Sequence, residues 1–334
     1  MKTKIRRIMC KEMAISVGTL ALMFFVITMG FAQTPLRKDV VTLAAINFHA
    51  VWGDKARNLE RIKGYIVAAA KQGADIIVFP EMALTGYDVD LKKEGKMQKE
   101  NAETIPGPST SEIAKLTQKY GVYVALGMPE RDKKNPDIIY NSAAVIGPKG
   151  VIGSYHKIHP YKPELKWCRK GKKPFVFDTP WGLIGVGICY DSYRFPELAR
   201  YYAALGARVY LNLTAIFEFR GWEDYYKHTL ASRSIENSMF VVSANLVGKD
   251  LKSYFPGGSL IMGPALNSRI KTYAGPADKE EQIVMATVDL SYSDSARTSA
   301  PLFTKNPISG TPDWRPKIYI KMLEDFIKNT KEGK

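Results

Sequence analysis

The sequence predicts an α/β fold without an internal domain boundary. Short runs rich in Val, Ile and Leu alternate with amphipathic runs whose apolar residues recur every three or four positions. The chain has 334 residues, of which 46% are hydrophobic, so it is long and apolar enough to bury a large core. No linker-like stretch interrupts this alternation.

The first predicted elements alternate between strand and helix. Each predicted strand is a compact apolar run such as VVTLAAINF, and each predicted helix has a period near 3.6 residues. In chain order they are strand 40–48, helix 58–71, strand 74–81, helix 111–120 and strand 122–130. This order is typical of α/β architecture.

Two predicted hairpins follow. The runs IIYNSAAVIGP and GVIGSYHKI are joined through Pro148, Lys149 and Gly150. Further along, DTPWG separates two apolar runs as a hairpin turn does. We therefore expect antiparallel pairs over 138–158 and 175–189.

The alternation then resumes and ends in a less regular tail. The predicted elements are helix 196–207, strand 208–215, helix 223–237, strand 240–247 and three strands over 257–264, 268–275 and 281–290. From Ser291 the pattern is irregular until the amphipathic helix 317–329. We expect this helix on the surface or against a partner subunit.

Residues 1–32 have the layout of an export signal. A basic start precedes the uncharged run MAISVGTLALMFFVITMGFA, and Gly30 and Ala32 are the small residues of a cleavage site before Gln33. A run of this length could also remain as a membrane anchor. In both cases the basic residues precede the apolar run, so the rest of the chain is expected outside the cytoplasm, in the periplasm or secreted.

Composition disfavours nucleic acid as a partner. The net charge is +15 at pH 7, but the lysines are scattered, and neither an aromatic-interleaved basic motif nor a zinc-finger spacing occurs. We interpret the charge as a solvated basic surface. After the signal segment only Cys168 and Cys189 remain, too few for a disulfide framework but enough for one bridge.

Three polar residues lie where strand-like runs end, which is where α/β folds usually display catalytic groups. They are Glu81 after ADIIVFP, Lys157 in SYHKIHP and Cys189 after GVGI. Glu81 is either a surface charge at a chain reversal or a carboxylate in a cleft. His156 and His159 open a cysteine–histidine alternative, but neighbours on a strand face opposite ways, so only one of His156 and Lys157 can face the thiol.

The three segments together resemble the nitrilase-like carbon–nitrogen hydrolases. The chain reads VFPEMALTGY, YHKIHPY and GVGICYDSYRFPE in the order of that family's glutamate, lysine and cysteine motifs, and the resemblance covers 41–290. It implies a single αββα sandwich catalytic domain over that range, between the signal peptide 1–32 and a C-terminal extension 291–334. It also implies a homo-oligomer, and the chemistry requires no metal or organic cofactor.

The resemblance implies a catalytic triad of glutamate, lysine and cysteine. Cys189 would be the nucleophile and Glu81 the general base and then acid, while Lys157 and the backbone N–H of Tyr190 would hold the oxyanion. A nearby lysine would also favour the thiolate of Cys189. Glu164 matches the family's second glutamate and would hold the substrate and the triad; the alternative is an exposed loop carboxylate.

Further candidates are assigned from the same resemblance. The chain has one residue more than the family's common CYD-x-RFPE, so Arg194 is not assigned to the substrate, and a structural pair of Asp191 with Arg194 is an equal interpretation. Four aromatic residues lie in segments that often line the pockets of this family. They are Tyr87, Tyr190, Phe217 and Trp222.

The sequence therefore predicts an exported amidohydrolase that cleaves a small linear amide or N-carbamoyl compound through a thioester on Cys189. Two alternatives stay open for the function: an acyltransferase that uses the same acyl-enzyme, and a binding protein that keeps the scaffold without turnover. For the thiol itself, a buried structural role and a bridge to Cys168 also stay open.

Overall fold

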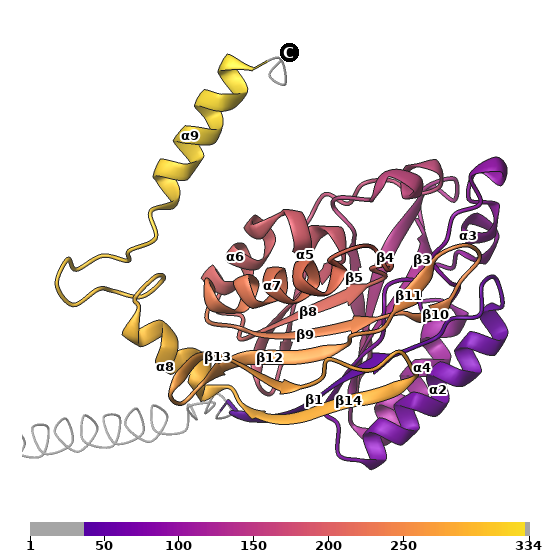
Figure 1. The fold of residues 1–334 in the computed structure, drawn as a ribbon, viewed down its shortest axis with the longest axis horizontal. Helices are drawn as coiled ribbons and strands as arrows, with labels where there is room; N and C mark the ends of the chain where they lie inside the picture. Colours follow the sequence, from indigo (N-terminus) through magenta and orange to yellow (C-terminus); the bar gives the residue numbers. More distant parts are fainter. Residues whose placement is uncertain (1–36, 331–334) are drawn as a thin grey trace, which may run out of the picture. The chain divides into compact units, whose positions relative to one another are not determined.

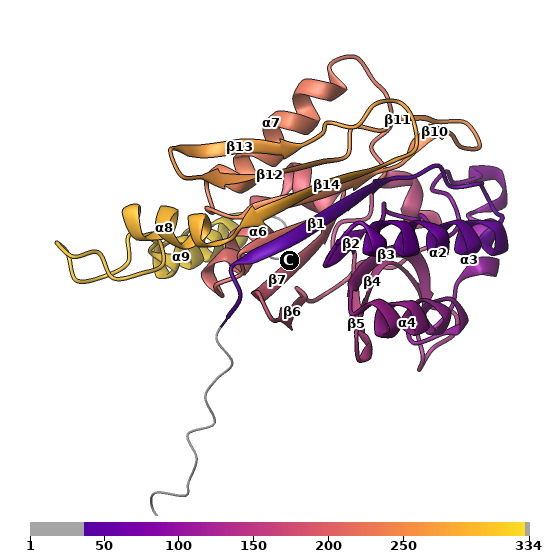
Figure 2. The same ribbon diagram turned by 90° about the horizontal axis from the view of Figure 1, so that it is seen from below.

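Two six-stranded sheets form the centre of the fold. The computed structural model describes residues 37–330, so the predicted signal segment 1–32 lies outside the described residues. The compact unit that contains the sheets begins at Lys38. Helices cover the outer face of each sheet, so the layers follow the order helix, sheet, sheet, helix (Figures 1 and 2). The predicted mixed α/β architecture is confirmed.

The first sheet has the strand order β14-β1-β2-β3-β4-β5. Strands β1, β2 and β3 are parallel, and the other neighbours are antiparallel, including the predicted hairpin of β4 and β5. Helices α2 and α4 lie on its outer side (Figure 2). The bounds are β1 Val40–Asn47, β2 Ile76–Val78, β3 Tyr123–Arg131, β4 Ile139–Gly147, β5 Gly150–His156, β14 Gln282–Asp289, α2 Lys55–Lys71, α3 Lys96–Asn101 and α4 Pro108–Tyr120.

The second sheet has the strand order β13-β12-β9-β8-β7-β6. Strands β7, β8 and β9 are parallel, and β6 and β7 form the second predicted hairpin. Helices α5, α6 and α7 cover its outer side (Figure 1). The bounds are β6 Val176–Thr179, β7 Gly182–Ile188, β8 Val209–Thr214, β9 Phe240–Asn245, β12 Leu260–Ala265, β13 Ser268–Ala274, α5 Tyr190–Arg194, α6 Pro196–Ala204 and α7 Trp222–Ile235.

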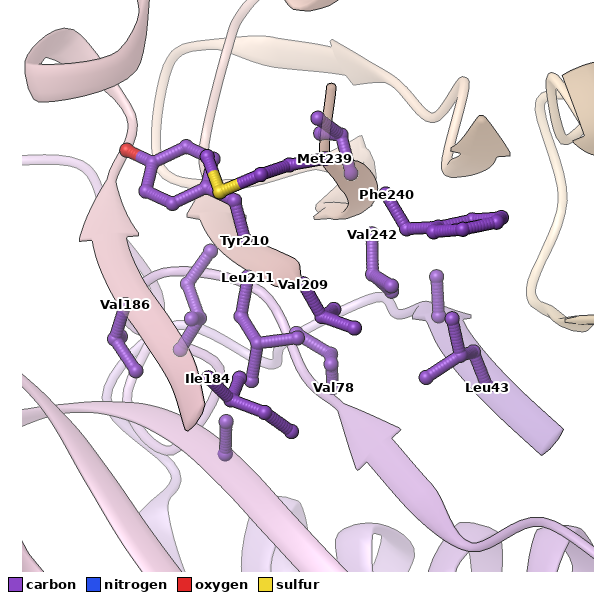
Figure 3. Packing of buried hydrophobic residues seen from close by; sticks show 14 of the residues in the cluster. Leu43, Val78, Ile184, Val186, Val209, Tyr210, Leu211, Met239, Phe240 and Val242 are labelled. Atoms are coloured by element: carbon purple, nitrogen blue, oxygen red, sulfur yellow. The ribbon is translucent and has the colours of Figure 1, made fainter. Parts of the chain in front are cut away.

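The central strands bury both faces, because successive side chains of a strand point in opposite directions and each face has a covering layer. In β1, Leu43 belongs to the apolar cluster between the sheets, whereas Ile46 belongs to the cluster under α2 and α4. Leu43 and Val78 of the first sheet lie opposite Val209 and Leu211 of the second (Figure 3). The continuous apolar runs of the sequence follow from this double burial.

The elements that the sequence pattern misses lack an apolar stripe. Helix α8, Ser291–Ser299, lies in the tail that is predicted to be irregular, and its buried residues are the polar Ser293 and Arg297. Strands β10 (Val247–Lys249) and β11 (Tyr254–Pro256) form a short separate hairpin.

The predicted C-terminal amphipathic helix is confirmed as α9, Pro316–Asn329. None of its residues is buried, so its apolar side chains lie on the surface as expected. Within residues 37–330, no helix has the length and hydropathy needed to cross a bilayer.

Candidate active site

Cys189 lies on a sharp turn between β7 and α5. Its φ of 47° and ψ of −103° form a strained conformation for a residue with a side chain, which costs about 1–3 kcal/mol and is concentrated at functional sites. Its backbone N–H donates to the carbonyl of Leu213 in β8 at 2.9 Å. The turn presents the thiol beyond the end of the parallel strands, while the residue stays 8% exposed.

Glu81 follows β2 and is fully buried. Its Oε1 accepts hydrogen bonds from Lys157 Nζ at 2.6 Å and Asn141 Nδ2 at 2.7 Å, and its Oε2 accepts from the backbone N–H of Ala215 at 3.0 Å. Gly127 of β3 lies directly against this segment, where an added Cβ would be 2.6 Å from Glu81 Cα. The carboxylate is therefore held in one orientation, and the surface-charge alternative is wrong.

Lys157 follows β5 and meets Glu81 in the interior. Its buried ammonium also donates to Glu164 Oε1 at 2.7 Å. His156 faces the other side of the strand, where its Nε2 lies 2.9 Å from Glu130 Oε2. As strand alternation predicts, Lys157 and His156 point to opposite sides of the strand, and His156 pairs with Glu130 and not with the thiol.

Glu164 completes a buried network from the short helix η2, Lys162–Lys166. Its Oε1 accepts from Tyr87 Oη at 2.7 Å as well as from Lys157, and its Oε2 accepts from Asn141 Nδ2 at 3.0 Å. The exposed-loop alternative is wrong. Asn141 bridges both glutamates, and the sequence analysis missed it. The available signal was an amide inside the mostly apolar run of β4.

The network holds two carboxylates and one ammonium away from water. Burial raises the pKa of Glu81 to about 7; Lys157 opposes this rise and Glu164 adds to it. Burial alone would lower the pKa of Lys157, but Glu164 and Glu81 outweigh it and hold that pKa well above its usual value. At neutral pH Lys157 is charged, and Glu81 is near its titration point, which suits a general base.

The Cys189 thiol is protonated at neutral pH. Burial is the largest cause of its raised pKa, and Glu81 raises it further. This pKa is lowered by Lys157, by the Thr214 hydroxyl and by the Ala215 N–H, but these three do not offset the rise. Lys157 therefore favours the thiolate as expected, but burial outweighs it, because burial excludes the water that would solvate the thiolate.

Cys189 opens into a cavity of about 320 Å³ with aromatic walls. Tyr87 and Phe217 line it as expected, but Trp222 does not. Trp222 begins α7, packs against Tyr226 with ring centroids 6.1 Å apart, and lines a separate cavity beside β12. The lining residues are Tyr87, Tyr161, Cys189, Tyr190, Tyr193, Arg194, Ala215, Ile216, Phe217, Phe219 and Tyr225.

Asp191 pairs with residues around Lys157 rather than with Arg194. Its Oδ2 accepts from Tyr155 Oη at 2.8 Å, and its Oδ1 lies 2.8 Å from His159 Nδ1. Arg194 is exposed, with its guanidinium 5.4 Å from the centroid of the Tyr225 ring. The suggested structural pair of Asp191 and Arg194 is wrong, because other donors occupy both oxygens of the carboxylate.

Cys168 and Cys189 are both free and buried, so the alternative of a single bridge is wrong. Cys168 lies beside the network, where its backbone N–H donates to the carbonyl of Glu164 at 2.9 Å. In the part of the chain that the structure describes, no group of three or more His, Cys, Asp or Glu side chains is arranged to hold a metal ion.

The site brings together groups that suit covalent acyl transfer: a thiol on a strained turn, a buried carboxylate and a fixed ammonium. On an α/β sandwich, such a set of groups is typical of a hydrolase. The chain belongs to the carbon–nitrogen hydrolase family, whose model matches residues 42–298, and it acts on non-peptide carbon–nitrogen bonds.

Similar proteins include both nitrilases and amidases. A probable nitrilase of Schizosaccharomyces pombe is 33% identical over 278 residues, which cover 81% of this chain and 94% of the relative. Omega-amidase NIT2 of Homo sapiens is 32% identical over 261 residues, covering 75% and 89%. A variant of the amidase from Nesterenkonia sp. AN1 has a TM-score of 0.68 at 22% identity and covers 85% of this chain and 100% of that chain, which supports the fold.

Proposed function

We propose that this protein is an exported amidohydrolase that cleaves a small linear amide or an N-carbamoyl compound through a thioester on Cys189. The observation that carries the proposal is the convergence of three strand ends on one buried centre. Glu81 and Lys157 are hydrogen-bonded at 2.6 Å, and Glu81 also bonds Ala215, which lines the cavity with Cys189. The relatives described as omega-amidases support amide cleavage.

In the proposed reaction, Glu81 removes the thiol proton while the sulfur of Cys189 attacks the carbonyl carbon. Lys157 Nζ and the backbone N–H of Tyr190 hold the resulting oxyanion; Tyr190 begins α5, where backbone N–H groups have no partner within the helix. Glu81 then gives its proton to the leaving amine as the carbon–nitrogen bond breaks. Water, deprotonated by Glu81, attacks the thioester, which releases the acid and restores the thiol.

Glu164 and Asn141 are the positioning residues of this scheme. Glu164 binds Lys157 and Asn141 binds Glu81, each at 2.7 Å; the two residues also bind each other at 3.0 Å, and both are fully buried. They fix the geometry of the base and the ammonium without contacting the reacting carbonyl. The scheme uses no metal and no organic cofactor.

The test is ammonia release from a panel of linear amides and carbamoyl compounds. Wild-type protein is expected to turn over at least one of them, and Cys189→Ala should lose turnover by about a thousandfold or more. Cys168→Ala is the matched control, because Cys168 does not line the cavity. Transfer to an added amine or lipid in preference to water would favour the acyltransferase, and binding without turnover would favour the non-catalytic alternative.

Export is proposed from the N-terminal segment of the sequence. N-terminal sequencing of protein recovered from its native compartment should give Gln33 as the first residue. A start at Met1 in a membrane fraction would mean that the segment is kept as an anchor. Recovery from the cytoplasm would contradict export.

A further inference from the structure

We infer that Asp250 is a positioning residue, which holds the backbone of Tyr87 so that the tyrosine hydroxyl stays on Glu164. The inference rests on the proposed amide hydrolysis, because it assigns Asp250 an effect on turnover at that same site. Asp250 is not among the residues that line the cavity, so it acts on the reaction through Tyr87.

Tyr87 has two contacts with the catalytic centre. Its ring lines the cavity into which Cys189 opens. Its buried hydroxyl donates to Glu164 Oε1 at 2.7 Å, and the same oxygen accepts from Lys157 Nζ at 2.7 Å. The position of Tyr87 therefore affects both the wall of the cavity and the orientation of the ammonium that would hold the oxyanion.

Two aspartates exchange hydrogen bonds between the loop that carries Tyr87 and the turn of the β10–β11 hairpin. Asp250 Oδ2 accepts from the backbone N–H of Tyr87 at 2.7 Å and from that of Asp88 at 2.9 Å. In return, Asp88 Oδ2 accepts from the backbone N–H of Lys252 at 2.7 Å and from that of Ser253 at 2.6 Å. Because hydrogen bonds to a carboxylate are stronger than those between neutral groups, each segment fixes the backbone of the other.

The hairpin also packs closely against Tyr87 and its neighbour. Gly86 has a φ of 84°, and an added Cβ there would lie 3.1 Å from Asp250 Oδ1 and 3.0 Å from Trp52 Cα. Phe255 of β11 packs edge-on against the Tyr87 ring, with ring centroids 6.0 Å apart. The hairpin therefore contacts both the backbone and the ring of Tyr87.

Fold stability alone does not explain the charge of Asp250. Burial raises the pKa of this carboxyl to about 6, and Asp88 adds to the rise, although the N–H groups of Tyr87 and Asp88 oppose it. A raised pKa means that the ionised carboxylate is less stable in the folded protein than in the unfolded chain. At pH 7 the charge therefore costs stability, which fits a group that serves the geometry of the site.

The first test measures turnover of the panel amide that the wild-type protein hydrolyses fastest, normalised to the folded fraction seen by circular dichroism. Asp250→Ala should lower kcat by about tenfold. Asp75→Ala is the matched control, because Asp75 is also half-buried and accepts a backbone N–H, that of Thr42 at 2.8 Å, but does not line the cavity. It should lower thermal stability and keep kcat.

Asp250→Asn separates positioning from stability. The amide oxygen can still accept from both N–H groups, but the bonds are weaker without the charge, so kcat should fall by about threefold. The same variant should be at least as thermally stable as the wild type at pH 7, because it removes a costly charge. It also carries the test if Asp250→Ala does not fold.

A double variant tests whether Asp250 acts through the tyrosine hydroxyl. Tyr87→Phe removes that hydroxyl alone, so adding Asp250→Ala to it should lower kcat by less than about threefold further. A crystal structure of Asp250→Ala should show the Tyr87 hydroxyl displaced from Glu164.

Four outcomes would overturn the inference. They are unchanged kcat in Asp250→Ala or Asp250→Asn, an equal loss of kcat in Asp75→Ala, full additivity with Tyr87→Phe, and an intact hydrogen bond from Tyr87 to Glu164 in the variant structure. Failure of the proposed function has a different signature, since the wild-type protein would then release ammonia from no amide in the panel. The crystal structure would in that case still decide whether Asp250 holds Tyr87.

Discussion

At the scale of single residues, burial raises the pKa values of Glu81 and Cys189 more than the nearby ammonium of Lys157 lowers them. Lys157 is close enough to donate to Glu81 at 2.6 Å, yet the pKa of Glu81 still rises to about 7 because the carboxylate is out of water. The pKa of the Cys189 thiol rises for the same first reason. The thiol of the resting protein therefore keeps its proton, and in the proposed reaction Glu81 removes that proton during attack.

This protonation state predicts a pH profile. In the proposed reaction the ionised form of Glu81 is the base, and with a pKa of about 7 that form is lost as pH falls below neutrality. We expect kcat/KM for a neutral amide to rise with pH, levelling off above an apparent pKa near 7. A neutral substrate such as pentanamide keeps its own ionisation out of the measurement. An apparent pKa near 4.5, the ordinary value for glutamate, would contradict the assignment.

Variants of the neighbouring residues Lys157 and His156 distinguish the glutamate–lysine–cysteine mechanism from the cysteine–histidine mechanism. Lys157→Ala removes an oxyanion donor and should lower kcat by about a hundredfold or more. His156→Ala should retain most activity, because His156 lies on the other side of the strand beside Glu130. Circular dichroism must show that both variants fold, since Lys157→Ala leaves two buried carboxylates without their cation. The reverse pattern of activities would indicate a cysteine–histidine hydrolase.

At the scale of elements, local periodicity identifies segments that bury an apolar face and misses those held by polar contacts. Strands β1 and β8 are predictable because each is almost wholly apolar and buried. Helix α8 is not, because Ser293 and Arg297 hold it in place by hydrogen bonds to backbone carbonyls in the loops before β9 and β8. Such contacts depend on tertiary structure and leave no period in the sequence.

The same distinction applies to the site. The sequence singles out Glu81, Lys157 and Cys189 because each is polar and lies at the end of a strand, and their predicted roles come from the family resemblance. Asn141 lies within β4, where nothing local shows that its amide meets two glutamates from distant segments. The raised pKa of the Cys189 thiol could not be predicted from the sequence either, because it depends on how completely the folded chain excludes water.

Gly127 provides a test of how two strands position the base. A Cβ at this residue of β3 would lie 2.3 Å from the Pro80 carbonyl oxygen and 2.5 Å from the Met82 nitrogen, both backbone atoms that cannot move freely. Gly127→Ala should therefore displace Glu81, lower kcat by about tenfold or more, and destabilise the fold by about 1–3 kcal/mol. Gly64→Ala in α2, with no atom within 4 Å, is the control and should keep activity and thermal stability. Unchanged turnover in Gly127→Ala would contradict this account.

At the scale of the whole molecule, we propose that α9 mediates self-association. Its apolar side chains Ile318, Met322, Leu323 and Phe326 are all exposed, whereas Lys321 belongs to its polar face. Met322→Asp should shift the sedimentation coefficient of the protein from that of an oligomer to that of a monomer. Lys321→Asp should leave the sedimentation coefficient unchanged. Wild-type protein that sediments as a monomer at micromolar concentration would contradict the proposal.

Because the catalytic centre combines distant segments, recovery of enzymatic activity also indicates that the chain has completed its tertiary structure. Glu81 bonds Lys157 76 positions further along and the N–H of Ala215 134 positions further along, so three distant strand ends must dock before the base is held. Closing such long loops is entropically costly, and contacts of this separation form slowly. Refolding should therefore restore helical and strand signals before turnover. A chain that has recovered its secondary structure but whose two sheets have not docked would show no turnover. The rate at which turnover returns would therefore measure the rate of docking.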